Sequence, residues 1–209
     1  YETYVVALDN FTTEKQQQPL YRKFPFLNEF VDTSKVSGKP ILNVSTRELA
    51  ATDYHQRKPS REKQIVHGRE WVGIEDFLPD EEVRSAVEAT LRDIDFFNEK
   101  VIILRNEFVS PFADYATTYY RFYLLDTIMV EGERCVDLAF FPRNAQSLGF
   151  TGHLYITSDS DHFVKWIQMN VPSDINLNFV QYMNIEQKFD RDFEHPRLLT
   201  YESITAEFK

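Results

Sequence analysis

The chain has 209 residues, of which 43% are hydrophobic and 27% are charged, enough apolar material for a sizeable core in one large domain or two small ones. Acidic residues outnumber basic ones by 33 to 23, and the net charge of −10 repels phosphate backbones, which argues against nucleic acid as a partner. No apolar run approaches the roughly 20 residues of a membrane-spanning helix. The chain shows no signal-peptide pattern and starts at Tyr1 rather than Met, so we expect a piece excised from a longer protein.

Residues 1–75 predict an N-terminal block of strands and loops. Alternating polar and apolar residues indicate the strands, and prolines and a polar tract mark the irregular backbone between them. The predicted strands are 1–8, 44–54 and 62–72. The last two flank a bend at 58–60 and are expected to form a hairpin.

Residues 80–97 have the pattern of a helix. Asp80 is suited to cap its first turn, where Glu81 and Glu82 favour the positive end of the helix dipole. Apolar residues then recur on one face: Val83, Val87, Leu91 and Ile94. We expect this helix to pack against a sheet.

Residues 101–209 predict an antiparallel meander, because strand patterns recur between short polar turns such as 131–133 and 159–161. After a strand at 101–104 and a link at 106–114, the predicted strands are 117–130, 134–141, 150–158, 162–171, 181–189 and 198–208. The predicted fold is α+β and mostly antiparallel β. About ten strands form a strongly curved meander or half-barrel with one helix packed on it, in a single domain over 1–209. Such a sheet leaves room for a ligand groove.

The sequence shows no motif of a catalytic or metal site. The five histidines share no two-ligand spacing, and the acidic turn 158–161 has too few oxygen donors for a calcium loop. Gly-x-Ser-x-Gly, Walker and dinucleotide-binding patterns are absent. Cys135 is predicted to be a packed strand thiol, and Glu131 and Glu133 to be solvated at a turn. We therefore expect no enzymatic activity, no cofactor and no metal, with an envelope hydrolase as the less favoured alternative.

Aromatic residues are the most distinctive part of the composition, with eighteen Phe, eleven Tyr and two Trp. In the predicted strand around 119–123 they alternate onto both faces, so one face belongs to the core. The other face is covered by a second layer, such as the N-terminal block, or binds an apolar ligand. The residues predicted to line such a ligand site are Tyr119, Phe122, Tyr123, Phe140, Tyr155 and Trp166.

Several ordered sequence blocks resemble those of a known family; they are residues 35–38, 93–98, 108–114, 119–127, 150–156, 175–180 and 185–187. They resemble an uncharacterised Bacteroidota envelope family, a domain of unknown function. Its members typically carry a carboxypeptidase-regulatory-like (transthyretin-like) module before this region and often an outer-membrane barrel after it. The resemblance covers nearly the whole chain and implies a periplasmic or outer-membrane-associated location in the cell envelope. At the level of fold alone, the meander is also similar to periplasmic lipoprotein-carrier half-barrels.

Two functions remain open from the sequence. The first is a non-catalytic extracytoplasmic domain of an outer-membrane-associated protein, whose half-barrel groove binds an apolar ligand or a partner segment. The second is a structural connector or protein-interaction module between a transthyretin-like module and an outer-membrane barrel, pairing through sheet edges. Long exposed strands at the two chain ends would favour the second. The expected partners are an apolar ligand or an envelope protein, with the outer membrane reached through modules outside this chain.

Overall fold

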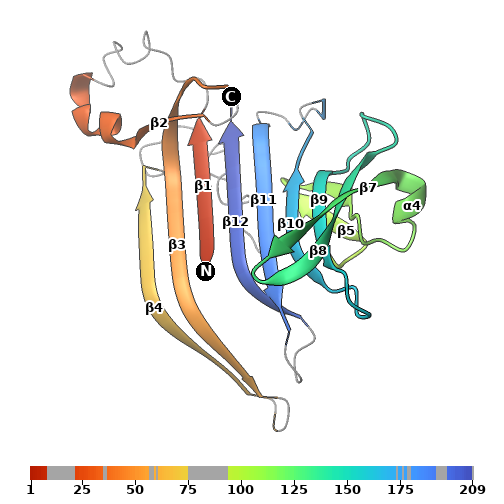
Figure 1. Cartoon of the computed structure of the whole chain (residues 1–209). Helices are drawn as coiled ribbons and strands as arrows, with labels where there is room; N and C mark the ends of the chain where they lie inside the picture. Colours follow the sequence, from red (N-terminus) through yellow and green to blue (C-terminus); the bar gives the residue numbers. More distant parts are fainter. Residues whose placement is uncertain are drawn as a thin grey trace.

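The computed structural model describes residues 1–8, 22–34, 37–56, 59, 61–74, 94–172, 174–175, 177, 180–191 and 197–208, except the side chains of residues 55 and 62. Within these residues, ten strands form one large curved sheet, and two more form a separate hairpin beside it (Figure 1). The predicted mostly antiparallel β fold is confirmed.

The second half of the chain forms the predicted meander. Its strands are β7 (Tyr120–Val130), β8 (Glu133–Pro142), β9 (Thr151–Thr157), β10 (Val164–Asn170), β11 (Val180–Asp190) and β12 (Leu198–Phe208). They lie side by side in chain order, and each pair is antiparallel. Between β7 and β8, Glu131 and Gly132 both have positive φ, of 48° and 88°. A two-residue turn of this kind matches the twist of the strands it joins.

The N-terminal strands extend the same sheet. They are β1 (Glu2–Leu8), β2 (Val31–Thr33), β3 (Pro40–Gln56) and β4 (Arg61–Gly73). β3 and β4 pair as the predicted hairpin, whose bend lies mostly outside the described residues. β1 lies between β3, to which it is antiparallel, and β12, to which it is parallel. The strands at the two chain ends are therefore interior strands paired on both sides, and the exposed edges lie elsewhere.

Short elements replace part of the predicted irregular backbone. A 3₁₀ helix, η1 (Pro25–Phe30), precedes β2. β5 (Lys100–Ile103) lies at the strand predicted over 101–104, and it pairs with β6 (Asn106–Val109), which occupies part of the predicted link. Residues 117–119, predicted as the start of a strand, belong to the one-turn helix α4 (Ala116–Tyr119). Sequence alternation alone does not distinguish such single turns from strand ends.

Most of the predicted helix at 80–97 lies outside the described residues. Its last residues are described, and 94–97 form no helix. The Asp95 carboxylate accepts a hydrogen bond from the Phe97 backbone N–H at 2.9 Å, and a second from the Asn98 side chain at 3.0 Å. Such local side-chain bonds compete with helical backbone bonds and favour a turn here.

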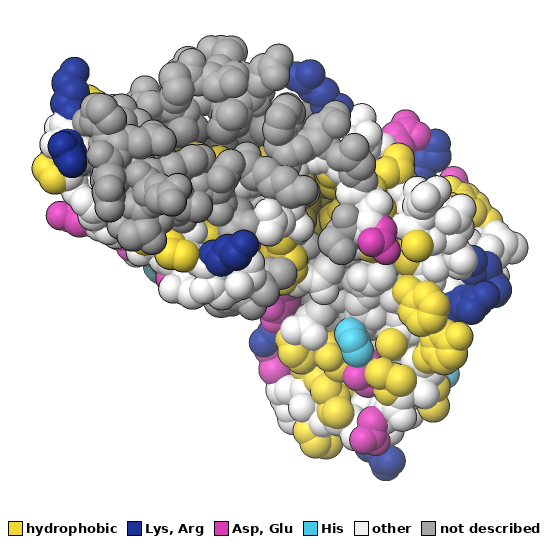
Figure 2. Space-filling view, turned by 90° about the horizontal axis from the view of Figure 1, so that it is seen from above, with side chains coloured by type: hydrophobic (Ala, Val, Ile, Leu, Met, Phe, Trp, Pro, Cys, Tyr) yellow, Lys and Arg dark blue, Asp and Glu magenta, His cyan; other side chains and the backbone are white. Residues whose placement is uncertain are grey.

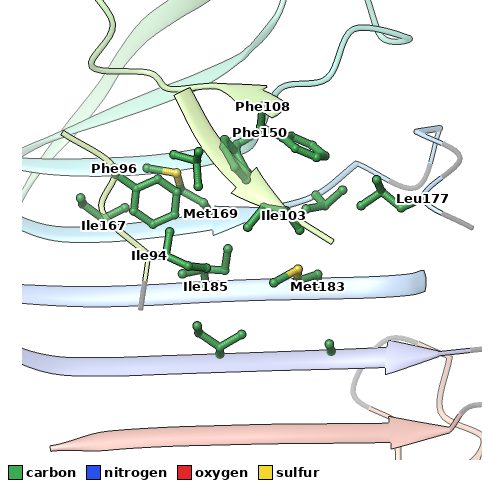
Figure 3. Close-up of a cluster of buried hydrophobic side chains, with 14 of the residues drawn as sticks. Ile94, Phe96, Ile103, Phe108, Phe150, Ile167, Met169, Leu177, Met183 and Ile185 are labelled. Carbon is green, nitrogen blue, oxygen red and sulfur yellow. The ribbon is translucent and has the colours of Figure 1, made fainter. Parts of the chain in front are cut away.

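The main core lies between the sheet and the segment 94–109, which crosses it (Figure 3). We call this side of the sheet the core face. Phe96 and Phe108 from the crossing segment both contact Phe150, with ring centroids 5.4 and 4.9 Å away. Beneath them, Ile167 on β10 and Ile185 on β11 are fully buried. Each such side chain contributes about 1.5–3 kcal/mol to folding through burial.

Candidate ligand-binding cleft beside β1

A cleft opens beside the first residue of β1. β1 begins to pair at Glu2, whereas β3 runs on to Gln56 and β12 begins at Leu198, several residues before its pairing with β1 starts. Figure 1 shows the N terminus between these two longer strands. Three cavities of about 480, 410 and 310 Å³ share Glu2 in their walls. We call them together the Glu2 cleft.

Much of the cleft wall is apolar. Its large apolar and aromatic side chains come from both halves of the sheet and from the segment before β5: Leu49, Trp71, Ile94, Phe97, Phe189 and Leu199. Trp71 is 63% exposed and Leu199 48% exposed, which is unusual for side chains of this size. The cleft therefore offers apolar surface that no other side chain of the described residues fully covers.

A hydrogen-bonded carboxylate lies in the walls of two of the cavities. Glu202 on β12 is 2% exposed and is the cross-strand neighbour of Glu2. Its two oxygens accept hydrogen bonds from the Tyr4 hydroxyl and the Gln187 amide, each at 2.5 Å. The Gln187 amide also donates to the Ile94 carbonyl at 2.6 Å. These bonds join β1, β11, β12 and the segment before β5, so they fix the shape of the wall.

Two arginines lie over aromatic rings of the same walls. The guanidinium carbon of Arg47 is 4.1 Å from the centroid of Trp71, and that of Arg197 is 3.2 Å from the centroid of Phe97. Arg47 and Trp71 are direct cross-strand partners in the β3–β4 hairpin. Cation–π contacts of this kind place positive charge against apolar surface. The cleft is thus suited to a ligand that has both apolar and polar parts.

The six aromatic residues predicted to line a groove are divided between the two faces of the sheet. Phe122 and Phe140 are cross-strand partners on the core face, and their rings contact each other and Tyr120. Tyr123 points to the opposite face, where its ring stacks on Phe141 with 5.3 Å between centroids. This division follows from the period of two along a strand.

Tyr155 and Trp166 also lie on the face opposite the core, stacked with 4.5 Å between ring centroids. Val130 and Cys135, from the end of the β7–β8 hairpin, form a small second core with Tyr155, and Trp166 packs against it. Burial raises the pKa of the Cys135 thiol and of the Tyr155 phenol above their ordinary values. Tyr119 lies in α4, and none of the six predicted residues lines the Glu2 cleft.

One histidine–carboxylate pair lies on the same face as Tyr155. The Nδ1 atom of His153 is 2.7 Å from a carboxylate oxygen of Asp137. The cross-strand neighbours of His153 are Ala139 and Gln168, whose methyl group and amide are not nucleophiles. The pair orients the imidazole ring, and neither of these two cross-strand neighbours supplies the nucleophile that a hydrolase places beside its base.

An ion-pair network lies where the β7–β8 turn meets β10 and the end of β11. The Lys165 ammonium group is almost fully buried and lies 3.3 to 3.4 Å from carboxylate oxygens of Glu131, Glu133 and Asp190. Burial disfavours its charge, but the Asp190 and Glu133 carboxylates outweigh that effect and raise the pKa of Lys165. Glu131 and Glu133 are therefore ion-paired as well as partly solvated.

Arg191 connects the acidic turn after β9 to this network. Its guanidinium group lies 2.6 Å from Asp159, 3.1 Å from Asp161 and 3.5 Å from Glu133. Hydrogen bonds from Arg191, and then from Thr157, lower the pKa of the Asp159 carboxyl to about 2. The turn that resembled part of a calcium loop thus uses its carboxylates in ion pairs.

Within the described part of the chain, no group of three or more His, Cys, Asp or Glu side chains is arranged to hold a metal ion. None of the helices described there is long and apolar enough to cross a membrane. Sequence analysis did not single out Glu2, Arg47, Trp71 or Glu202. The predicted β3–β4 hairpin contained one usable signal, because counting outward from its bend places Arg47 close to Trp71.

Comparison with protein-family models matches residues 43–209 to a family of unknown function (DUF5686). No curated protein and no solved structure matches the chain.

Proposed function

We propose a function from one premise, that the chain belongs to DUF5686, a family of unknown function. The proposal is a non-catalytic extracytoplasmic domain of an outer-membrane-associated protein that binds an apolar or amphiphilic ligand in the Glu2 cleft. The envelope location, the Bacteroidota source and the neighbouring transthyretin-like module and barrel rest on the sequence resemblance alone. The likeness to periplasmic lipoprotein carriers is likewise an expectation from the sequence.

The observation that carries the proposal is the combination of side chains in the Glu2 cleft. Exposed Trp71 and Leu199 supply uncovered apolar area beside the arginines that pack on Trp71 and Phe97. Ligand sites typically join apolar walls to a few polar groups in fixed positions. Here Glu202 and Gln187 are such groups, because hydrogen bonds hold both in place.

The non-catalytic part of the proposal is supported by how the titratable groups are used. The carboxylates of the two acidic turns are bound to Lys165 and Arg191. His153 faces an alanine and a glutamine across the strands. A general acid or base needs a reacting group within hydrogen-bond reach, and these side chains are occupied with structural partners.

Native mass spectrometry with lipid extraction, on protein expressed in a bacterial envelope, tests the proposal. We expect an apolar ligand at near-stoichiometric level. After delipidation, the uncharged probe N-phenyl-1-naphthylamine should bind with increased fluorescence. Leu199→Trp, which fills two of the cavities, should weaken probe binding by about tenfold.

Ile102→Trp is the matched control, since Ile102 is 69% exposed on β5 and lines none of the three cavities. Its probe binding should equal that of the wild type. A clean apo mass together with no probe binding would refute the ligand proposal. Equal loss of binding in both variants would place the probe outside the Glu2 cleft.

The connector function is the second candidate, and one observation favours it. The strands at the chain ends are interior, but β7 at one end of the sheet and β4 at the other each have one strand neighbour among the described residues. Both strands carry exposed apolar side chains, which include Trp71 on β4 and Leu124 on β7. Unpaired edges of this kind are templates for adding another strand.

A further inference from the structure

β7 is the last strand in the order of the large sheet, and its far edge is paired with no strand of the described chain. The side chains along its middle are open to solvent: Tyr123 is 45% exposed, Leu125 55% and Leu124 74%. Figure 2 shows hydrophobic side chains gathered on the right-hand lobe of the molecule, the side on which Figure 1 places β7, β8 and β9. An exposed apolar strand edge is unfavourable in an isolated protein.

Both faces of β7 are apolar. Tyr123 lies on the face opposite the core, stacked on Phe141. Leu124 and Met129 lie on the core face, as the cross-strand partners of Leu138 and Arg134, and Met129 is 65% exposed. Apolar residues on both faces are typical of a strand that has neighbours on both sides and cover on both faces.

The other sheet edge differs in its charge. β4 carries five charged residues among its thirteen, whereas β7 carries only Arg121 and Asp126 among its eleven. Charged residues on an edge strand protect it from pairing with other chains. β7 has little of this protection, so it is the better edge for association.

A bulge in β7 determines which residues share a position along the strand. Leu124 pairs with Leu138 and Thr127 with Val136, so Leu125 and Asp126 together face Asp137. Counted from Tyr123, Phe122 and Leu124 are therefore one position away on either side. Arg121 and the Leu125–Asp126 pair are two positions away, on the same face as Tyr123.

We propose that β7 is a homodimer interface, in which two copies of this chain pair antiparallel through β7 about a two-fold axis at Tyr123. In this register Phe122 of one copy lies opposite Leu124 of the other, and Arg121 lies opposite the position that Leu125 and Asp126 of the other copy share. The symmetry repeats both contacts, so two apolar pairs and two opposite-charge pairs form. An axis at Asp126 would instead oppose two like charges. The interface is distant in sequence from the Glu2 cleft and does not depend on the ligand proposal.

Analytical ultracentrifugation across a concentration series tests this inference. The wild type should be a monomer–dimer system with no larger species. Arg121→Asp and Asp126→Arg should each raise the dimer dissociation constant about tenfold, because attraction becomes repulsion at both pairs. The double variant R121D/D126R should restore the wild-type constant, since it exchanges the two charges.

Two further variants separate the interface from general effects. Leu124→Lys changes a side chain that is 74% exposed, so it should weaken the dimer without loss of folding, as monitored by circular dichroism. Arg61→Asp, at the exposed start of β4, makes the same charge change as R121D and should leave the dimer intact. A wild type that is monomeric throughout, a double variant that fails to restore pairing, or growth beyond the dimer would each overturn the proposal. The last would indicate open-ended pairing of β7 with β4.

Discussion

Tyr120 on β7 links its strand to β6 and to the residue before β9 at one end of the core. Its side chain is fully buried, and its hydroxyl donates a hydrogen bond to the Val109 carbonyl on β6. The same hydroxyl accepts one from the Phe150 N–H at 3.1 Å. Tyr120→Phe keeps the ring but removes the hydroxyl that both backbone groups bind, which should cost about 1–3 kcal/mol. Urea unfolding of the variant measures this loss.

Tyr123→Phe is the matched control for that change, because its side chain is 45% exposed and lies three residues along the same strand. Its free energy of unfolding should stay within about 0.5 kcal/mol of the wild type. Equal losses in the two variants would show that the Tyr120 hydroxyl has no special role.

Cys135 is the only cysteine, so a thiol reagent measures the reactivity of this residue alone. Cys135 on β8 is fully buried in the small second core, and burial raises the pKa of its thiol. A thiol that is both inaccessible and protonated reacts slowly. We expect no reaction of the native protein with Ellman's reagent over the time in which urea-unfolded protein reacts completely. Prompt reaction of the native protein would contradict the burial of Cys135.

At the scale of elements, the sequence predicted where the strands lie along the chain better than it predicted which strands pair with one another. The meander could be predicted because polar turns such as Glu131–Gly132 separate alternating strands, and consecutive antiparallel strands then pair. The parallel contact of β1 with β12 joins the two ends of the chain and leaves no local pattern. Ile94 fits the helical spacing of apolar residues, but residues 94–98 form a turn. The Asp95 carboxylate accepts a hydrogen bond from the Phe97 backbone N–H, which favours this turn over a helix.

Gly152 on β9 is the glycine whose replacement should most disturb the sheet. A Cβ atom there would lie 2.0 Å from the Gln168 carbonyl oxygen and 2.9 Å from the Met169 Cα atom, both backbone atoms of β10. Gly152→Ala must push β9 and β10 apart, and we expect a loss of about 3 kcal/mol, the upper end for overpacking. Thermal and urea unfolding check this value.

Gly68→Ala on β4 makes the same substitution where a Cβ atom would have nothing within 4 Å. It should leave stability unchanged or raise it slightly, since alanine reduces the freedom of the unfolded chain. Equal free energies of unfolding for Gly152→Ala and Gly68→Ala would show that the backbone of β10 does not approach Gly152 as closely as described.

At the scale of the whole molecule, the candidate cleft could not be predicted because its walls come from distant parts of the chain. Glu2, Leu49, Trp71, Phe97 and Leu199 meet only through the non-local order of the strands. The six aromatic residues predicted to line a groove lie on both faces of the sheet for a local reason. Adjacent positions along a strand point to opposite faces, so composition identifies aromatic strands without saying which rings converge.

The ion-pair network ties the β7–β8 hairpin to β10 and β11, and it should make the stability of the fold depend on pH. The Asp159 carboxyl has a pKa of about 2 in the folded protein, below its ordinary value of 3.8, because Arg191 and Thr157 donate hydrogen bonds to it. A lowered pKa contributes stability that is fully present above the ordinary value and is lost as the pH falls through the folded value.

Asp159→Asn should therefore lower the melting temperature at neutral pH, and the difference from wild type should shrink between pH 4 and pH 2. Asp114→Asn, at an exposed position between β6 and α4, is the control and should keep the wild-type pH profile. A deficit of Asp159→Asn that stays constant down to pH 2 would mean that the carboxylate charge does not hold these elements together.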